Sequence, residues 1–104
     1  MFIAIYEFDV KDGMEEQFAE AWLAVTRGIY KQYGSYGSRL QKDKSGKYIG
    51  YAQWPDRQTW AKDWPPNPQL ASERNAMQAC LNTSSIVYEA EVVADYLQPH
   101  THKG

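Results

Sequence analysis

The sequence is poor in the features that mark secreted and membrane proteins. A single cysteine, Cys80, is present among 104 residues, so no intramolecular disulfide can form. The start of the chain, MFIAIYEFDVKDG, acquires charge too early for a secretory signal peptide. No apolar run approaches the roughly 20 residues that span a bilayer. These absences predict a cytoplasmic protein that does not enter the membrane.

A strong charge of one sign is also missing. The formal net charge is -2, and the lysines and arginines are scattered along the chain. The sequence therefore offers no basic field to attract a nucleic-acid backbone. Its two histidines, His100 and His102, have no cysteine or carboxylate beside them. No metalloprotease, cysteine-pair, phosphate-loop or nucleophile-elbow motif occurs. We expect no nucleic-acid partner, no metal and no other cofactor.

Aromatic residues are abundant, with eight Tyr, four Trp and three Phe. Such rings often fill cores, but this many also suit a pocket for a flat ligand or a subunit interface. With 43% apolar and 23% charged residues, the composition is that of an ordinary globular protein. The length supports one domain, which we place at residues 1–98, followed by a polar tail at 99–104.

Hydrophobic spacing and turn residues predict four strands and three helices. They are a strand at Phe2–Val10, a helix at Met14–Tyr33, strands at Ser38–Asp43 and Lys47–Trp54, a short helix at Arg57–Asp63, a helix from Asn67 to about Leu81, and a strand at Ile86–Leu97. The expected N-caps are Asp12 or Gly13, then Asp56, then Asn67. The order βαββααβ matches the split βαβ, or ferredoxin-like, motif, an α+β antiparallel sheet with helices on one face.

The face of the sheet opposite the helices is also apolar in part. Ile3 and Ile5 point to that face, together with parts of the last strand at Val87, Val93 and Leu97. An apolar sheet face should not remain bare in a soluble protein. We therefore expect a symmetric homodimer, with the two sheets packed face to face.

Three segments resemble the antibiotic biosynthesis monooxygenase (ABM) family. They are a first strand that ends in the turn Lys11-Asp12-Gly13, a helix rich in Glu and Trp, and the segment Gly50–Asp56 with Trp60 behind it. The resemblance covers roughly Phe2 to Leu97, and it implies a dimeric α+β barrel. Characterised members of that family include cofactor-free oxygenases of aromatic polyketides, haem-degrading enzymes and quinol oxidases.

The haem-degrading members provide a further comparison. Their functional Asn, Trp and His positions fall on Tyr6, Trp64 and Arg74 in a loose alignment. Arginine is not an iron ligand, so the resemblance does not imply haem degradation here. The same three positions still converge on one cavity, which the resemblance therefore marks as the site.

Arg74 has the most unusual placement in the chain. It interrupts an apolar helical stripe that is made by Leu70, Met77 and Leu81. A guanidinium in such a place costs free energy unless it is paired or faces a wet cavity. Arg74 could hold a phenolate, enolate or carboxylate in that cavity. The structural alternatives are an arginine that snorkels out of the core, or an ion pair with Glu7, Glu89 or Glu91.

The aromatic candidates have structural alternatives too. Trp60 and Trp64 are four residues apart on one helical face, and they either line a pocket or simply pack in the core. Tyr6 shares a strand face with apolar residues, so its hydroxyl needs a partner. That partner is either a ligand, with Tyr6 as proton donor, or a nearby backbone group.

The sequence thus predicts a cofactor-independent monooxygenase acting on a small aromatic ligand such as a quinol, an anthrone or a polyketide. The expected catalytic residues are Arg74 and Tyr6, and the expected binding residues are Trp64, Trp60, Tyr51 and Met77. No residue stands out as a base. One alternative is a non-catalytic small-molecule-binding or stress-related dimer that uses the same pocket. Another is a structural module whose pocket is filled by its own side chains.

Overall fold

The structure, a computed structural model, describes residues 1–65 and 67–97. Its elements follow the predicted order. They are β1 (Phe2–Val10), α1 (Glu15–Tyr33), β2 (Gly37–Lys42), β3 (Tyr48–Trp54), α2 (Arg57–Ala61), α3 (Pro68–Gln78) and β4 (Leu81–Glu91). The predicted tail at 99–104, with His100 and His102, lies outside the described residues.

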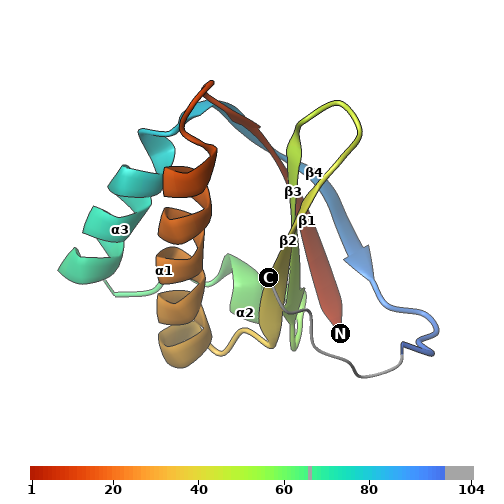
Figure 1. Cartoon of the computed structure of the whole chain (residues 1–104). Coiled ribbons are helices and arrows are strands. Elements are labelled where there is room, and N and C mark those ends of the chain that lie inside the picture. The colour runs from red at the N-terminus through yellow and green to blue at the C-terminus, as the bar shows by residue number, and fades with distance from the viewer. Residues whose placement is uncertain (66, 98–104) are drawn as a thin grey trace.

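The four strands form one antiparallel sheet in the order β2-β3-β1-β4. The helices lie on one face of this sheet, with α1 and α3 side by side (Figure 1). The predicted α+β, ferredoxin-like arrangement is therefore confirmed. In the described part of the chain, no helix has the length and apolar character needed to cross a bilayer.

Helix α1 lays an apolar stripe on the sheet. Phe18, Trp22 and Val25 on this stripe are buried, and they recur at helical spacing. The helix ends at Gly34, whose φ of 79° is the left-handed conformation that glycine adopts without strain. Its start differs from the prediction of a cap at Asp12 or Gly13. The preceding turn extends one residue further, and Met14 occupies the cap position without a side-chain hydrogen bond.

Two predicted caps begin the other helices. Asp56 accepts a hydrogen bond from the backbone N–H of Thr59 at 2.7 Å, and Asn67 accepts one from Leu70 at 3.1 Å. Helix α2 ends at Ala61 rather than Asp63, because Lys62 is already extended ahead of the proline-rich segment. Helix α3 ends at Gln78, not at Leu81.

The prediction of a last strand at Ile86–Leu97 was wrong at both ends. Strand β4 runs from Leu81 to Glu91, and it includes the polar run 82–85, which the prediction left between the last helix and the last strand. Its register with β1 begins at Val10, which pairs with Leu81. Polar side chains are tolerated there because β4 is an edge strand and is exposed along almost its whole length.

The core beneath the helices consists of two clusters. One contains Phe2 and Trp54, and the other contains Phe8 and Phe18 together with Cys80, a buried free thiol. Tyr6 packs against both clusters. On the helix-covered face of the sheet, Tyr6 therefore lies at the boundary between the two core clusters. The cavities described below adjoin this boundary.

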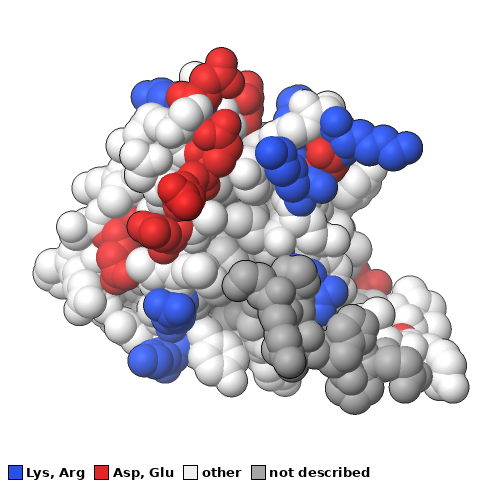
Figure 2. Space-filling model, viewed as in Figure 1, with Lys and Arg blue, Asp and Glu red and all other residues white. Residues whose placement is uncertain are grey.

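Acidic and basic side chains lie on different parts of the surface shown in Figure 2. Acidic groups gather over α1, whose first turn carries Glu15 and Glu16, and basic groups gather at the hairpin between β2 and β3. Lys47 of this hairpin forms an ion pair with Glu7 of β1 at 2.9 Å. The hairpin turn is held by Asp43, which accepts hydrogen bonds from the backbone of Ser45 and Lys47.

Candidate functional site

A cavity of about 690 Å³ lies between the sheet, α1, α3 and the segment that joins α2 to α3. It has the size of a small-molecule site. The residues on its wall fall into an aromatic and a polar group. The aromatic group is Tyr6, Tyr33, Trp54, Trp60 and Trp64, and the polar group includes Lys62, Asp63, Asn67, Arg74, Asn75 and Gln78. The cavity is open to the surface, and the side chains of its wall leave this volume free.

Tyr6 is oriented by Trp60. The indole Nε1–H of Trp60 donates a hydrogen bond to the Tyr6 hydroxyl oxygen at 2.8 Å. This bond links β1 to α2, and Trp60 also packs on Phe2 with ring centroids 5.1 Å apart. The expected hydroxyl partner therefore exists, but it is a side chain rather than a backbone group. Because the Tyr6 oxygen is the acceptor in this bond, its own O–H proton remains available for a second partner.

The surroundings of Tyr6 keep its phenol protonated. Burial raises the pKa of Tyr6 above its ordinary value and outweighs the other effects. The hydrogen bond from Trp60 and the positive charge of Arg74 lower this pKa, and the charge of Glu89 raises it. At neutral pH Tyr6 is thus a hydrogen-bond donor and not a base.

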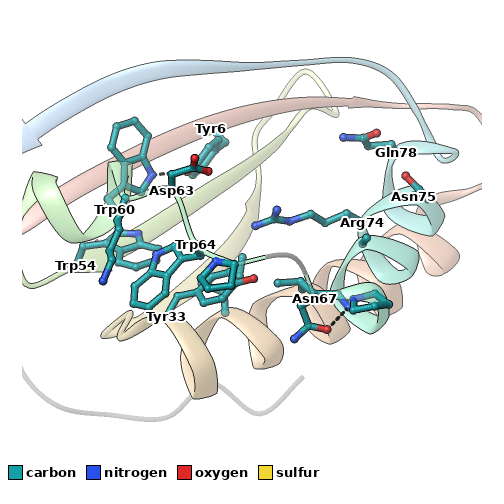
Figure 3. A pocket seen from close by; sticks show the side chains of 16 residues that line it. Tyr6, Tyr33, Trp54, Trp60, Asp63, Trp64, Asn67, Arg74, Asn75 and Gln78 are labelled. Carbon is teal, nitrogen blue, oxygen red and sulfur yellow. Dashed lines mark hydrogen bonds between the residues drawn. The ribbon is translucent and has the colours of Figure 1, made fainter.

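Arg74 projects from α3 across the cavity toward the tryptophans (Figure 3). The three glutamates considered as its ion-pair partners are bound elsewhere. Glu89 pairs with Arg57 at 2.9 Å, and Glu7 and Glu91 pair with Lys47 and the N-terminal amine. Among residues 1–65 and 67–97, Arg74 has no ion pair. Its guanidinium is exposed to the open cavity. Contact with solvent there removes the free-energy cost that a charge in an apolar stripe would otherwise have.

Trp64 lies in a stack at the cavity wall. Its ring is 4.9 Å from that of Tyr33 at an interplanar angle of 12°, and the ammonium of Lys62 lies 4.4 Å from its centroid. The indole N–H groups of Trp54 and Trp64 are buried and have no hydrogen-bond partner in the described part of the chain. Buried donors are normally paired in native structures, so these two are unused hydrogen-bonding groups of the cavity wall.

The structure adds wall residues that sequence reasoning did not single out. Asp63 is the one carboxylate among the described residues of the cavity wall, and it lies on the same side as Trp60 in Figure 3. Tyr33 supplies the stack under Trp64. The one available signal for Asp63 was its position before Trp64-Pro65. A helix cannot continue easily into that proline, so Asp63 was free to leave the helix and reach the cavity.

A second space of about 240 Å³ adjoins the first and shares four wall residues with it. The shared residues are Tyr6, Ile29, Trp54 and Arg74. We call this second space the channel. Met77 lies on its wall and not on the wall of the larger cavity, which includes Trp60 and Trp64. Arg74 and Tyr6 therefore stand where the cavity and the channel meet.

The side chain of Tyr51 does not lie on the aromatic wall of the larger cavity. It borders the channel through its place between Gly50 and Ala52, but its register partners are Ile5 on β1 and Arg39 on β2. Side chains alternate along a strand, and a Cβ on Gly50 would meet Phe8 on the helix side. The ring of Tyr51 therefore belongs to the opposite face of the sheet, away from Trp60 and Trp64.

The wall thus offers a cation, a phenol donor, a carboxylate and flat aromatic surfaces. These groups can bind an electron-rich aromatic and stabilise an oxyanion on it. Within the described residues, no group of three or more His, Cys, Asp or Glu side chains gathers to hold a metal ion.

Comparison with known proteins identifies relatives of the fold. No protein-family model and no curated protein matches the sequence. Among solved structures, a proposed antibiotic biosynthesis monooxygenase from Bordetella bronchiseptica is 14% identical, with a TM-score of 0.75 over 89% of this chain and 97% of its own. A similar protein from Nitrosomonas europaea is 15% identical, with a TM-score of 0.71 over 90% and 100%.

The third comparison is SnoaB from Streptomyces nogalater, a cofactor-independent oxygenase. It is 17% identical, with a TM-score of 0.68 over 93% of this chain and 97% of its own. At these identities the comparisons show the fold, and the chain has the fold of the ABM structures over nearly its whole length. The resemblance inferred from the sequence is confirmed to that extent.

Proposed function

We propose that this protein is a cofactor-independent monooxygenase acting on a small, electron-rich aromatic such as a quinol or an anthrone. The observation that carries the proposal is Arg74. Its unpaired guanidinium, among the described residues, faces a wall of stacked aromatic rings, and the oriented phenol of Tyr6 stands beside it. The oxygenase activity of SnoaB, which shares the fold, supports the same reaction class.

The reaction needs only the substrate and dioxygen. The substrate's CH₂ group, which lies beside a phenol or carbonyl, loses a proton, and the carbanion delocalises onto the oxygen. It passes one electron to O₂, and the resulting radical pair forms a C–O bond. The peroxide takes up the proton and loses water, which leaves a carbonyl. For an anthrone the sum is CH₂ + O₂ → C=O + H₂O. A quinol has no such CH₂ group, and there the phenolate reacts with O₂ at the ring carbon ortho to its oxygen, so that loss of water leaves a hydroxyquinone: C₆H₆O₂ + O₂ → C₆H₄O₃ + H₂O. In both reactions O₂ is the only oxidant.

In this scheme the protein stabilises the deprotonated substrate. The guanidinium of Arg74 and the O–H of Tyr6 donate to the substrate oxygen on which the negative charge develops. Trp64 and Trp60 form the flat surface against which the ring lies. We assign the role of proton acceptor to Asp63, the carboxylate of the wall, which returns the proton to the peroxide.

The active form that we propose is a homodimer. Tyr51, Ile5 and Tyr88 form a row across β3, β1 and β4 on the face opposite the helices, and Tyr88 is 66% exposed. Beyond β4, Val93 and Tyr96 are 96% and 92% exposed. Apolar surface of this extent favours a second copy as its cover. A free, buried Cys80 thiol accords with a reducing, cytoplasmic location.

Oxygen uptake with a panel of anthrones and hydroquinones tests the proposal. The wild-type protein is expected to consume one O₂ per anthrone oxidised, without added metal or flavin. Arg74→Ala is expected to lower kcat/KM by about 10²- to 10³-fold, and Arg27→Ala, on an exposed part of α1, is expected to leave it unchanged. Equal activity in the two variants would remove Arg74 from the mechanism.

A second variant tests the proton acceptor. Asp63→Asn is expected to lower kcat by about 10²-fold with little change in the dissociation constant of a non-reactive anthraquinone. If the panel binds tightly to wild-type protein and no oxygen is consumed, the protein is a small-molecule-binding dimer instead.

A further inference from the structure

The helix-covered face of the sheet is not filled evenly. The positions of β2 and β3 that face α1 include Ser38, Gly50 and Ala52, which carry small side chains or none. Protein interiors are normally packed to the density of organic crystals. Small residues beneath a helix therefore leave a gap unless larger neighbours close in, and here the gap is the channel of about 240 Å³.

The channel is lined by residues of α1, α3 and the sheet. It begins at Tyr6 and Arg74, where it shares its wall with the larger cavity, and it reaches Ser38 and Thr26 near the β2 edge of the sheet. Apolar side chains dominate its sides, among them Phe8 and Val25. Its volume is that of about eight water molecules in the liquid. A mostly apolar space of this volume that adjoins the cation has room for a chain of carbons beside a ring held in the larger cavity.

We propose that the channel binds an apolar side chain of the aromatic ligand, of up to about eight carbons. The inference rests on the proposed function for the position of the ring and deepens it by naming the substrate class. The acidic oxygen of the ligand lies at Arg74 and Tyr6, the ring lies against Trp64, and the chain passes between α1 and the sheet. The preferred substrate is then an alkyl-substituted phenol or hydroquinone rather than the bare ring.

Gly50 is the residue that keeps the channel open at its centre. A Cβ built there would lie 3.0 Å from the ring of Phe8 and 3.7 Å from the indole nitrogen of Trp22. Any larger side chain at this position would occupy the space that the chain needs. Because that substitution also disturbs the core, the test uses Thr26, a half-buried residue on α1 at the other end of the channel.

The experiment measures the binding of monoalkyl hydroquinones, from methyl to octyl, by quenching of tryptophan fluorescence under argon. The wild-type dissociation constant is expected to fall by up to about fourfold for each methylene added, until the channel is full. Thr26→Phe is expected to flatten this dependence while binding of unsubstituted hydroquinone is kept. The matched control, Leu23→Phe on the exposed side of α1, should behave as wild type.

Two results would overturn the inference: a wild-type dissociation constant that does not depend on chain length, or the same dependence in Thr26→Phe and Leu23→Phe. These results are separate from a failure of the proposed function. Oxygen uptake without a chain-length effect removes the channel as a subsite and leaves the oxygenase. A chain-length effect abolished by Thr26→Phe, without oxygen uptake from any hydroquinone or anthrone, keeps the subsite and removes the oxygenase.

Discussion

The two faces of the sheet are built from the same strands, but the helices of the described residues lie on only one of them. On the helix-covered face, Phe2, Phe8 and Trp54 are nearly inaccessible, whereas on the opposite face Tyr88 is 66% exposed. The difference follows from connectivity. Among residues 1–65 and 67–97, every helix lies on the same side of the sheet, so one face receives all of these helices and the other none (Figure 1).

The two faces of the sheet also differ in the kind of exposed surface that they present. On the helix side this surface is the wall of the cavity. It is concave, it has a cation without an ion pair in the described chain, and it suits a small ligand. On the opposite side the exposed surface is a row of apolar and aromatic side chains across three strands, which suits another sheet. Variants on the two faces should therefore affect different properties of the protein.

The largest expected effect is on the stability of the helix-covered face. Phe18 is fully buried between α1 and the sheet, and Phe18→Ala should lower the free energy of unfolding by about 3–5 kcal/mol. Leu23→Ala, on the exposed side of the same helix, should change it by less than about 0.5 kcal/mol. Urea denaturation followed by circular dichroism measures both. Similar losses would mean that α1 does not pack as described.

On the opposite face the expected effect is on assembly. Tyr88→Arg places a charge in the proposed dimer interface and should weaken self-association by about 30-fold or more. The fold of each subunit should persist, because Tyr88 contributes little to its core. Light scattering over a concentration series checks this. Tyr36→Arg, at an exposed site away from the row, is the control, and a wild-type protein that is monomeric at every concentration contradicts the dimer.

A smaller effect is expected at the wall of the cavity. Asn67 caps α3, so Asn67→Ala should cost about 1 kcal/mol and loosen the first turn of the helix that carries Arg74. Asn67→Asp keeps an oxygen acceptor and should restore most of the loss. Thermal unfolding compares the two, and the exposed substitution Gln69→Ala serves as control. An equal loss in Asn67→Asp would assign the effect to the side-chain amide instead of the cap.

The smallest effect is confined to alkaline pH. The pKa of Tyr6 is raised in the folded protein, mainly by burial. The unfolded chain therefore releases the phenol proton at a lower pH, and stability is lost as the pH rises from about 10 toward the folded pKa. Tyr6→Phe should lack this contribution, so its stability should fall less steeply over that range. Parallel pH profiles for the two proteins would show that Tyr6 titrates normally.

Local patterns predicted most of the fold. The alternation in Phe2–Val10, the apolar stripe of α1, and the caps at Asp56 and Asn67 are each set by neighbours within a few residues in sequence. The ends of β4 were missed for the opposite reason. Its bounds depend on which residues β1 offers for pairing, and the alternation in 86–97 carries no information about that register.

The candidate site also has residues that local sequence patterns predicted and residues that they did not. Sequence reasoning found Arg74, because a charge in an apolar helical stripe is visible without a structure. It did not find Asp63, whose place on the cavity wall depends on where α2 ends, nor the face on which Tyr51 lies. It also left the partner of Tyr6 open, since Trp60 is 54 residues away along the chain. Contacts across such separations are made by the fold and not by local spacing.

The sequence by itself determined the order of the elements, the single apolar layer under the helices, and the placement of Arg74 on α3. These follow from short-range periodicity and from the conformations of proline, glycine and capping residues. Only the tertiary structure decided that the three candidate glutamates pair elsewhere, that the phenol of Tyr6 is held by Trp60, and that small residues leave a channel behind Arg74. The physical reason is that pairing and packing depend on which distant side chains meet, and the sheet register and helix docking set those meetings.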